Sequence, residues 1–195
     1  MIRGVIFDCF GVLYSGSLTM LMNMAPEGRA QEVHDINQQK DYGYLSYEEY
    51  LEQTGHVVGK TANEVDELLR KKHMRNTELV EYARQLKASG VCKVAMLSNI
   101  GERTIHDLFG DELSELFDTV VLSYEEGLAK PNPAIFTLTA ERMGLPPEEC
   151  VMIDDLADNC EGAEVAGMKS IQHTFNTLTI GRVEELLAAD DAAGN

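Results

Sequence analysis

The sequence predicts an α/β fold, a doubly wound parallel sheet into which a small helical domain is inserted. Two observations favour it. Short apolar runs with strand character alternate with segments of helical period, which implies right-handed crossovers between parallel strands. One long segment near the N-terminus interrupts this alternation and shows helical patterns only.

Four apolar runs bounded by turn residues are interpreted as strands, and a fifth run is weaker. They are residues 3–9, 92–99, 117–123 and 150–155, with the weaker run at 169–174. Near-continuous aliphatic and β-branched runs are typical of strands that are covered on both faces, as in a parallel sheet.

Four segments between these runs have a helical period. They are residues 76–90, 101–117, 132–144 and 158–168. The first opens at Asn76 and ends at Gly90, and the third opens at Asn132 and ends at Gly144. A polar residue at the start and a glycine just past the end are typical helix boundaries, so these two helices are the best defined.

The interrupting segment holds four further helical patterns and no strand pattern. They are residues 17–24, 28–40, 46–53 and 61–74. We therefore expect residues 15–75 to form an inserted helical domain, and residues 1–14 and 76–195 to form the α/β core.

Composition excludes several classes of partner. Sixteen basic against 33 acidic side chains give a net charge of −17, which disfavours binding to nucleic acid or to an anionic membrane surface. No apolar run reaches the ~18 residues of a membrane span. The N-terminus lacks the pattern of a signal peptide, and the four cysteines show no CxxC pairing. We expect a cytoplasmic protein with reduced thiols.

Residues that carry chemistry follow the predicted strands. In open α/β sheets the ligand binds at the carboxyl edge of the strands, so side chains at these ends should meet. The candidates at these ends and in the loop after the third strand are Asp8, Ser98, Asn99, Lys130, Asp154 and Asp155.

The chemistry of this set is coherent. Asp8, Asp154 and Asp155 would repel one another strongly as bare carboxylates, so a divalent cation is implied. Ligands that are all oxygen favour Mg²⁺. The cation and Lys130 could hold a phosphoryl group, to which Ser98 and the Asn99 amide could donate. One carboxylate would then be free to attack phosphorus and form an aspartyl-phosphate.

The chain resembles the haloacid dehalogenase-like (HAD) hydrolases, in the branch that carries a helical C1-type cap after the first motif. The resemblance covers the whole chain in order: DxxGV from Asp8, LSN around Ser98, GxxKPxPxIF around Lys130 and IDDxxxNxxGAxxxGM from Ile153. It implies a Rossmann-like core and a hydrolase.

The resemblance also implies a role for each matching residue. Asp8 would be the nucleophile, Ser98 the phosphate-binding hydroxyl and Lys130 the charge-stabilising base. Asp155 would bind Mg²⁺ with Asp154 beside it. The backbone carbonyl of Phe10 would be a further metal ligand.

Phe10 is the departure from the family pattern. Most HAD phosphatases carry a second Asp at this place, which protonates the leaving group and later activates water; general acid–base catalysis of this kind is typically worth ~10²–10⁴-fold. Three interpretations stay open. The first is a Mg²⁺-dependent phosphatase that acts on a small phosphorylated metabolite such as a sugar phosphate. The second is a haloacid dehalogenase, and the third is a non-catalytic binding protein. The presence of Asp8 and Lys130 argues against a non-catalytic protein, and the Asp154–Asp155 pair argues against a dehalogenase, which needs no metal. The phosphatase is therefore favoured.

Substrate contacts are expected from the inserted helices. Gly43 and Tyr44 lie in a turn where capped relatives often place substrate-facing loops, and Arg75 lies where the chain re-enters the core. The sequence identifies neither the substrate nor the oligomeric state.

Overall fold

A five-stranded parallel sheet forms the centre of the protein. The structure, a computed structural model, describes residues 1–16, 18–41, 43–72 and 74–189. The strands are β1 (Gly4–Phe7), β2 (Lys93–Ser98), β3 (Thr119–Leu122), β4 (Cys150–Asp154) and β5 (Lys169–Gln172). They lie in the order β3-β2-β1-β4-β5 and every pair is parallel. The predicted doubly wound α/β fold is confirmed.

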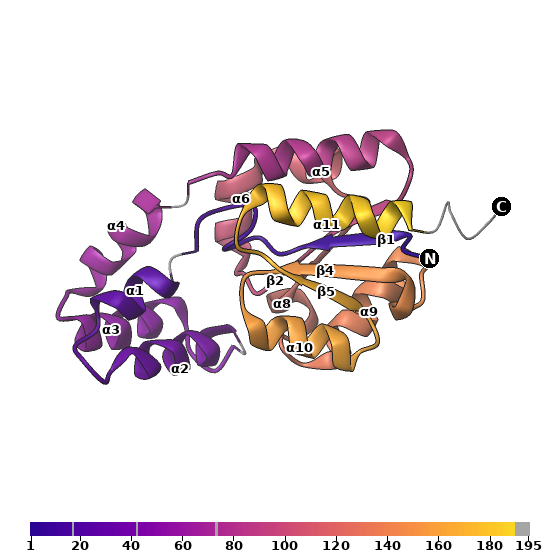
Figure 1. Ribbon diagram of the computed structural model, residues 1–195. Helices are drawn as coiled ribbons and strands as arrows, with labels where there is room; N and C mark the ends of the chain where they lie inside the picture. Colours follow the sequence, from indigo (N-terminus) through magenta and orange to yellow (C-terminus); the bar gives the residue numbers. More distant parts are fainter. Residues whose placement is uncertain (17, 42, 73, 190–195) are drawn as a thin grey trace.

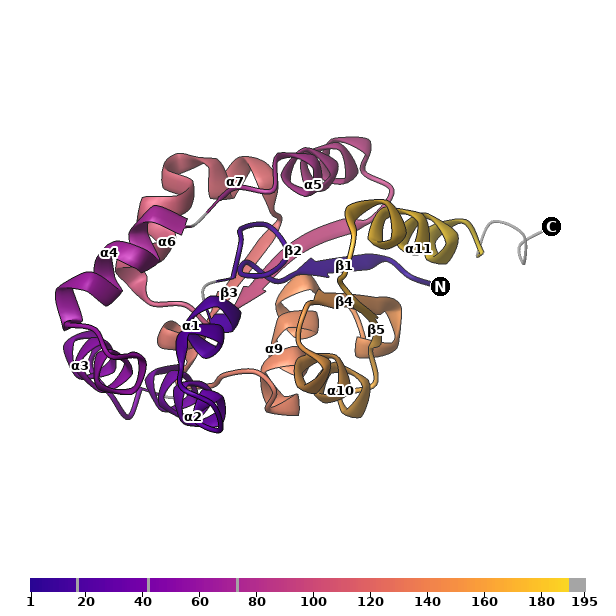
Figure 2. The same ribbon diagram turned by 60° about the vertical axis from the view of Figure 1, so that its left-hand side comes forward.

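Helices cover both faces of the sheet (Figures 1 and 2). One face packs against α5 (Thr77–Ser89), α6 (Glu102–Phe109) and α11 (Asn176–Ala188), and the other against α9 (Pro133–Met143) and α10 (Ala157–Val165). Along β1, Val5 and Phe7 belong to the first of these two apolar clusters and Ile6 to the second. Successive side chains of a strand point to opposite faces, so a continuous apolar run suits this sandwiched position.

Two features of the core differ from the prediction. The segment expected as one helix over 101–117 is broken into α6, a 3₁₀ turn (Gly110–Glu112) and α7 (Leu113–Leu116), and Gly110 has a φ of 51°. Only glycine adopts that region readily, which ends the helix. The structure also forms α11, which the sequence pattern did not indicate. Its Thr179 and Val183 are buried in the core.

The remaining short elements are α8 (Ser123–Glu126) and a 3₁₀ turn at Pro147–Glu149. The best-defined helix ends are as expected. The Asn76 side chain accepts from the Leu79 amide at the start of α5, and Gly90 ends that helix in the left-handed conformation.

The helical insertion forms a group of its own beside the sheet (Figure 1, left). Its helices are α1 (Leu18–Met24), α2 (Ala30–Asp41), α3 (Tyr47–Val58) and α4 (Ala62–Lys72). They enclose a separate apolar cluster that includes Leu21, Val33, Tyr50 and Val65. A capping box between Ser46 and Glu49 starts α3.

Two adjacent chain segments connect the insertion to the core. Tyr14 and Arg75 form an isolated antiparallel bridge, and the amide of Ser15 donates to the carbonyl of Met74 at 2.8 Å. These contacts lie at the boundaries predicted at residues 14/15 and 75/76. They are consistent with that division, which stays a prediction.

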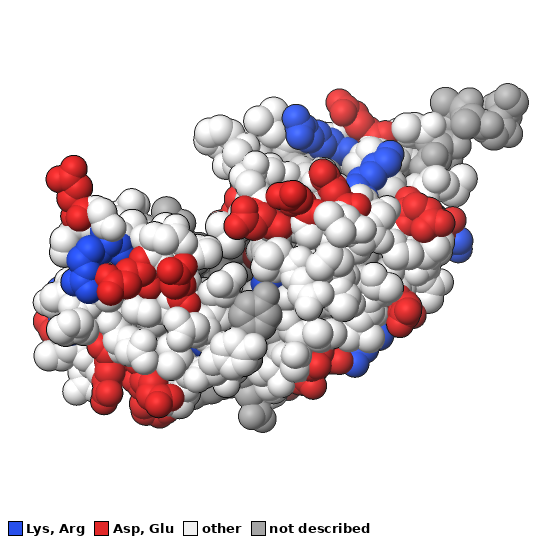
Figure 3. Space-filling view, turned by 90° about the horizontal axis from the view of Figure 1, so that it is seen from below, with Lys and Arg blue, Asp and Glu red and all other residues white. Residues whose placement is uncertain are grey.

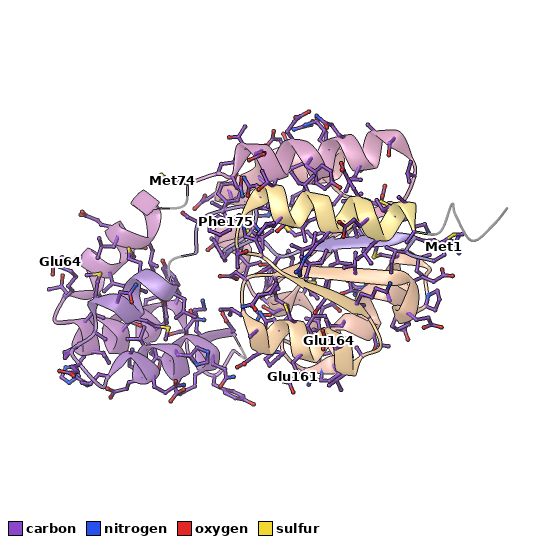
Figure 4. All side chains as sticks on the ribbon, viewed as in Figure 1. Met1, Glu64, Met74, Glu161, Glu164 and Phe175 are labelled. Atoms are coloured by element: carbon purple, nitrogen blue, oxygen red, sulfur yellow. The ribbon has the colours of Figure 1, made fainter. Side chains whose placement is uncertain are left out.

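Helix α10 turns one face to the sheet and one to solvent. Glu161 and Glu164 on this helix are exposed (Figure 4), and Glu164 accepts from the Ser170 hydroxyl of β5 at 2.7 Å. Asn159 and Ala163 are buried, so the helix aims the Asn159 amide at the end of β4. Among the described residues, no helix combines the length and the apolarity that a membrane crossing requires. All four cysteines are free and buried.

Candidate active site

The candidate site lies at the carboxyl edge of the three central strands. Asp8 directly follows β1, Ser98 ends β2, and Asp154 ends β4. Strands β2 and β4 flank β1 in parallel, with Phe7 opposite Met96 on one side and Ile153 on the other. The strand ends therefore meet at one place, and Lys130 joins them from the loop before α9.

Lys130 bridges two of the carboxylates. Its Nζ lies 2.8 Å from Asp8 Oδ1 and 2.6 Å from Asp154 Oδ2, and its side chain is only 1% exposed. Burial alone would lower the pKa of Lys130, but the carboxylates of Asp154 and Asp8 outweigh it and raise the pKa above its ordinary value. The group therefore stays an ammonium, because a buried charge is tolerated when it is paired and hydrogen-bonded.

Asp154 is the anchor of this bridge. Its Oδ2 accepts from Lys130, and its Oδ1 accepts from the Leu156 amide at 3.0 Å and from Asn159 Nδ2 at 2.9 Å. Both oxygens are thus engaged by donors of the chain. The prediction that Asp154 also binds the cation stays a prediction, while the observed contacts show that it positions Lys130.

Asn99 holds the backbone of the same lysine. Its Nδ2 donates to the carbonyl of Lys130 and its Oδ1 accepts from the amide of Lys130, both at 2.9 Å. This pair fixes the loop that presents the ammonium. One of the two Nδ2 hydrogens of Asn99 is engaged in this way, and the expected donation from the Asn99 amide to a phosphoryl group stays a prediction.

Asp8 carries buried charge that is only partly compensated. Its Oδ1 accepts from the Cys9 amide at 2.6 Å as well as from Lys130. Burial raises the pKa of the Asp8 carboxyl well above its usual range, because Lys130 offsets only part of that effect and the charges of Asp154 and Asp155 add to it. In the described part of the chain, the bonds to this carboxylate all go to Oδ1, which leaves Oδ2 for a cation or a substrate.

Asp155 lies against the turn that follows Asp8. A Cβ on Gly11 would fall 2.1–2.4 Å from its carboxyl atoms, and Gly11 has a φ of +83°. Space and backbone conformation thus both require glycine here. Burial, and then the charge of Asp154, raise the pKa of Asp155 to about 6.

The three acids fit a divalent cation. Asp8, Asp154 and Asp155 each offer a carboxylate oxygen within 4.8 Å of the others, and within the described ranges no other group of three or more His, Cys, Asp or Glu gathers in this way. Oxygen ligands without imidazole or thiolate suit a hard cation. Burial, and then the charges of neighbouring carboxylates, raise the pKa values of Asp8 and Asp155, and a bound cation would offset both effects.

A cavity of about 130 Å³ opens at this edge, between the core and the insertion. Asp8, Ser98, Lys130 and Asp155 line its core side. The Ser98 hydroxyl is buried and has no hydrogen-bond partner among the described residues. An unpartnered buried hydroxyl is unfavourable unless a ligand completes its bonding, so this oxygen is suited to an anionic group in the cavity.

Phe10 also lines the cavity, at the place where most relatives of the predicted kind carry an acid. Its ring is partly buried and packs against the apolar cluster on the α5 face of the sheet. It contributes an apolar wall and no titratable group.

The three weaker substrate candidates do not meet at this cavity. Arg75 pairs with Glu112 through two hydrogen bonds, and Tyr44 is 76% exposed. Gly43 lines an adjacent hollow of about 270 Å³ between the insertion and the core. Neither Arg75 nor Tyr44 lines either space.

The insertion lines the cavity with residues that the sequence interpretation did not single out. They are Leu18, Asn37, Lys40, Asp41, Tyr47, Tyr50 and Leu69. No motif marks them, because their nearness to Asp8 depends on how the insertion packs over the sheet edge. The dense polar and aromatic composition of residues 37–50 was the available signal.

The sheet, its helical insertion and the acidic site define a capped, doubly wound enzyme. The family model of haloacid dehalogenase-like hydrolases matches residues 2–167. The chain belongs to this family, as the sequence motifs predicted, and is a hydrolase of the HAD type.

Three curated relatives illustrate the range of the family. Acyl-CoA dehydrogenase family member 10 of Mus musculus is 28% identical over 207 residues, 95% of this chain and 19% of the relative. Glyceraldehyde 3-phosphate phosphatase of Methanopyrus kandleri is 36% identical over 89 residues, 45% of this chain and 38% of the relative. The (S)-2-haloacid dehalogenase of Xanthobacter autotrophicus is 25% identical over 212 residues, 100% of this chain and 81% of the relative. The chain spans less than half the length of the first two.

Two solved structures share the fold. The HAD family enzyme BT-2542 of Bacteroides thetaiotaomicron, in complex with magnesium and inorganic phosphate, has a TM-score of 0.67 and 21% identity, covering 91% of this chain and 99% of that one. A predicted HAD-like family hydrolase of Porphyromonas gingivalis has a TM-score of 0.69 and 25% identity, covering 94% and 98%.

Proposed function

We propose that this chain is a Mg²⁺-dependent phosphatase that hydrolyses a small phosphorylated metabolite through an aspartyl-phosphate on Asp8. The observation that carries the proposal is the surroundings of Asp8. A buried ammonium, Lys130, contacts one of its oxygens, and the unpartnered hydroxyl of Ser98 lines the same cavity. A carboxylate nucleophile with cationic and hydrogen-bonding groups beside it suits phosphoryl transfer, in which charge stabilisation dominates.

Asp8, Asp155 and the backbone carbonyl of Phe10 would hold the cation, with Asp154 close by. When bound, Mg²⁺ would neutralise charge on the phosphoryl oxygens and orient the group for attack. Among these cation ligands, Asp155 gives the strongest support, because it is a half-buried carboxylate whose pKa is raised to about 6. Asp154 contributes mainly by holding Lys130 in place.

The reaction has two displacements. A carboxylate oxygen of Asp8 attacks phosphorus, the bond from phosphorus to the ester oxygen breaks, and the leaving alkoxide takes a proton from water. Water then attacks the phosphorus of the aspartyl-phosphate and loses a proton to solvent. Inorganic phosphate leaves and the Asp8 carboxylate is restored. Lys130 and the Ser98 hydroxyl stabilise the charge on the phosphoryl oxygens in both steps.

The absence of an acid at the position of Phe10 lowers the rate of both displacements. No acid stands there to protonate the leaving group or to activate water, which is help typically worth ~10²–10⁴-fold. Substrates whose leaving group departs easily, such as acyl phosphates and sugar 1-phosphates, need that acid least.

The comparisons support this proposal. One relative is named a glyceraldehyde 3-phosphate phosphatase, and one structural neighbour contains magnesium and inorganic phosphate. The similarity to that neighbour, at 21% identity, speaks for the fold, so the case for phosphatase chemistry depends on the residues around Asp8.

Haloacid dehalogenase activity is the second candidate. The (S)-2-haloacid dehalogenase of Xanthobacter autotrophicus aligns with 100% of this chain. The resemblance to dehalogenases also includes an aromatic residue in the first motif, at the position of Phe10. Asp8 would then attack the carbon that carries the halogen, and halide would leave. That chemistry needs no cation and leaves Asp155 unexplained, so we rank it second.

A paired assay separates the candidates. Phosphate release is measured from a panel of phosphate esters with 5 mM Mg²⁺ or with EDTA, and halide release from 2-chloropropionate. Asp8→Asn is the inactive comparison, and exposed Glu161→Gln is the control. Phosphate release that needs both Mg²⁺ and Asp8 supports the proposal. Halide release without Mg²⁺ would establish the second candidate, and silence in both assays would favour a non-catalytic binding protein.

A further inference from the structure

The insertion closes the cavity with a polar and aromatic cluster from the end of α2 and the start of α3. Its members are Asn37, Lys40, Asp41, Tyr47 and Tyr50, which we call the cap cluster. It lies across the cavity from the residues that would hold the phosphoryl group. It therefore faces the rest of the substrate.

Lys40 is held in place on three sides. Its Nζ lies 2.9 Å from Asp41 Oδ1 and donates to Asn37 Oδ1 at 3.2 Å. The same atom lies 4.8 Å from the centre of the Tyr50 ring. Asn37 in turn donates from Nδ2 to Asp41 Oδ2 at 2.9 Å. Hydrogen bonds and a cation–π contact thus fix the two charges relative to each other.

The two charges of the cap cluster balance. The side chains of Lys40 and Asp41 are 27% and 11% exposed, so both act at short range and with limited screening. A second anionic group on a substrate would be attracted by Lys40 but repelled by Asp41 beside it. Acidic side chains are also spread over both the core and the insertion in Figure 3, in keeping with the net charge of −17.

Hydroxyl groups fit this wall better than an anion does. A hydroxyl can donate to the carboxylate of Asp41 and accept from Lys40 or from the Asn37 amide. The tyrosine rings supply flat apolar surface between these polar atoms. The cavity of about 130 Å³ is small beside the ~300–1,000 Å³ of pockets for drug-sized ligands, and Lys40, Asp41 and Tyr47 also line the adjacent hollow of about 270 Å³.

We propose that the Lys40–Asp41 pair selects phosphate esters whose leaving group is a small, uncharged polyol, and disfavours esters that carry a carboxylate or a second phosphate. This inference rests on the proposed phosphatase function and names its substrate class. Lys40 and Asp41 act as specificity residues here, and Asp8 remains the reacting group.

Two matched substrate pairs test the inference. Glycerol 1-phosphate is compared with 3-phosphoglycerate, and sorbitol 6-phosphate with 6-phosphogluconate, because within each pair a terminal CH2OH group stands in place of a carboxylate. The wild type should show a higher kcat/KM for the uncharged member of at least one pair. Asp41→Asn leaves the charge of Lys40 uncompensated, and should shift that ratio toward the anionic member by about tenfold or more. Lys40→Met should shift it the other way.

Controls keep the test specific. Glu52→Gln makes the same charge change as Asp41→Asn on an exposed position of α3, and Lys60→Met matches Lys40→Met within the insertion; neither residue lines the cavity. Both should leave the ratios unchanged. If Lys40 and Asp41 only stabilised the insertion, their substitution would lower the melting temperature without changing the kcat/KM ratios. The inference would be overturned if folded Asp41→Asn and Lys40→Met kept the wild-type ratio of kcat/KM between the two members of each pair. It would also be overturned if the wild type preferred the anionic members.

Binding to Asp8→Asn separates this inference from the proposed function. With Mg²⁺ present, this variant is titrated calorimetrically with both members of each pair. Tighter binding of the uncharged member by a protein whose wild type releases no phosphate would uphold the cap preference and overturn the phosphatase proposal. Phosphate release by the wild type together with tighter binding of the anionic member would uphold the phosphatase proposal and overturn the cap preference.

Discussion

The carboxyl group of Asp155 occupies the space that a side chain on Gly11 would need. The two residues follow different strands, β1 and β4, yet a Cβ at Gly11 would lie 2.1 Å from the carboxyl carbon of Asp155. The turn after Asp8 and the acid after β4 thus fit together only because one of them lacks a side chain. This contact fixes the place of the acid most suited to bind a cation.

Gly11→Ala should displace Asp155 and weaken the metal site. We expect loss of Mg²⁺ binding and of phosphatase activity, with a cost of ~1–3 kcal/mol for the positive φ. Gly90→Ala is the matched control, since Gly90 has a φ of +67° and nothing within 4 Å of the added Cβ. It should show a similar stability loss and full activity. Equal Mg²⁺ affinity in the two variants, measured by calorimetry, would refute the role of the contact.

Mg²⁺ should stabilise the protein more at pH 7.5 than at pH 5. The pKa of Asp155 is raised to about 6, above its ordinary value of 3.8, so the folded metal-free protein binds this proton more tightly than the unfolded chain does. Its contribution to stability therefore falls as the pH rises from about 4 to about 6. Cation binding requires the ionised form, and a cation at 100 times its Kd adds ~2.7 kcal/mol.

The measurement is the melting temperature with and without Mg²⁺ at both pH values. Asp155→Asn should lose the Mg²⁺-dependent increase and gain stability in the metal-free state near pH 7. Glu161→Gln, an exposed change of the same charge on α10, is the control. A Mg²⁺ effect that survives Asp155→Asn would place the cation elsewhere.

Lys130→Met should destabilise the core as well as abolish activity. It leaves Asp8 and Asp154 buried without a cation, and breaking a buried ion pair in this way costs ~3–5 kcal/mol. The double variant Lys130→Met with Asp154→Asn removes one of the two uncompensated charges. It should recover part of the free energy of unfolding, measured by urea denaturation, and none of the activity. No recovery in the double variant would show that the bridge is not the source of the loss.

Phe10→Asp should help poor leaving groups most. An acid at this position could protonate the leaving oxygen, so kcat/KM for an alkyl phosphate should rise relative to an aryl phosphate by up to ~10²–10⁴-fold. The ring packs against the apolar core, so part of the gain is offset by lost stability. Phe175→Asp, at a ring that is 69% exposed, controls for the change of charge. An unchanged ratio in a folded, Mg²⁺-binding variant would show that Phe10 does not replace a lost acid.

The fold and the residues at the strand ends were predictable because both follow from local patterns in the sequence. Apolar runs and cap residues predicted the strands and most core helices. The parallel arrangement then required Asp8, Ser98 and Asp154 to meet, since neighbouring strands end at one edge. Helix α11 was missed because Gly181 and two threonines, Thr177 and Thr179, weaken its helical pattern, and packing of Val183 in the core stabilises it instead.

The sequence by itself determined which chemical groups gather at the sheet edge. Only the tertiary structure decided how each group is used. Asp154 and Asn99 both hold Lys130, and Arg75 pairs with Glu112 away from the cavity. The partners of a long polar side chain depend on residues distant in sequence, so no local pattern fixes them. For the same reason the cap cluster around Lys40 and Asp41 emerged only when the insertion was seen packed over the edge of the sheet.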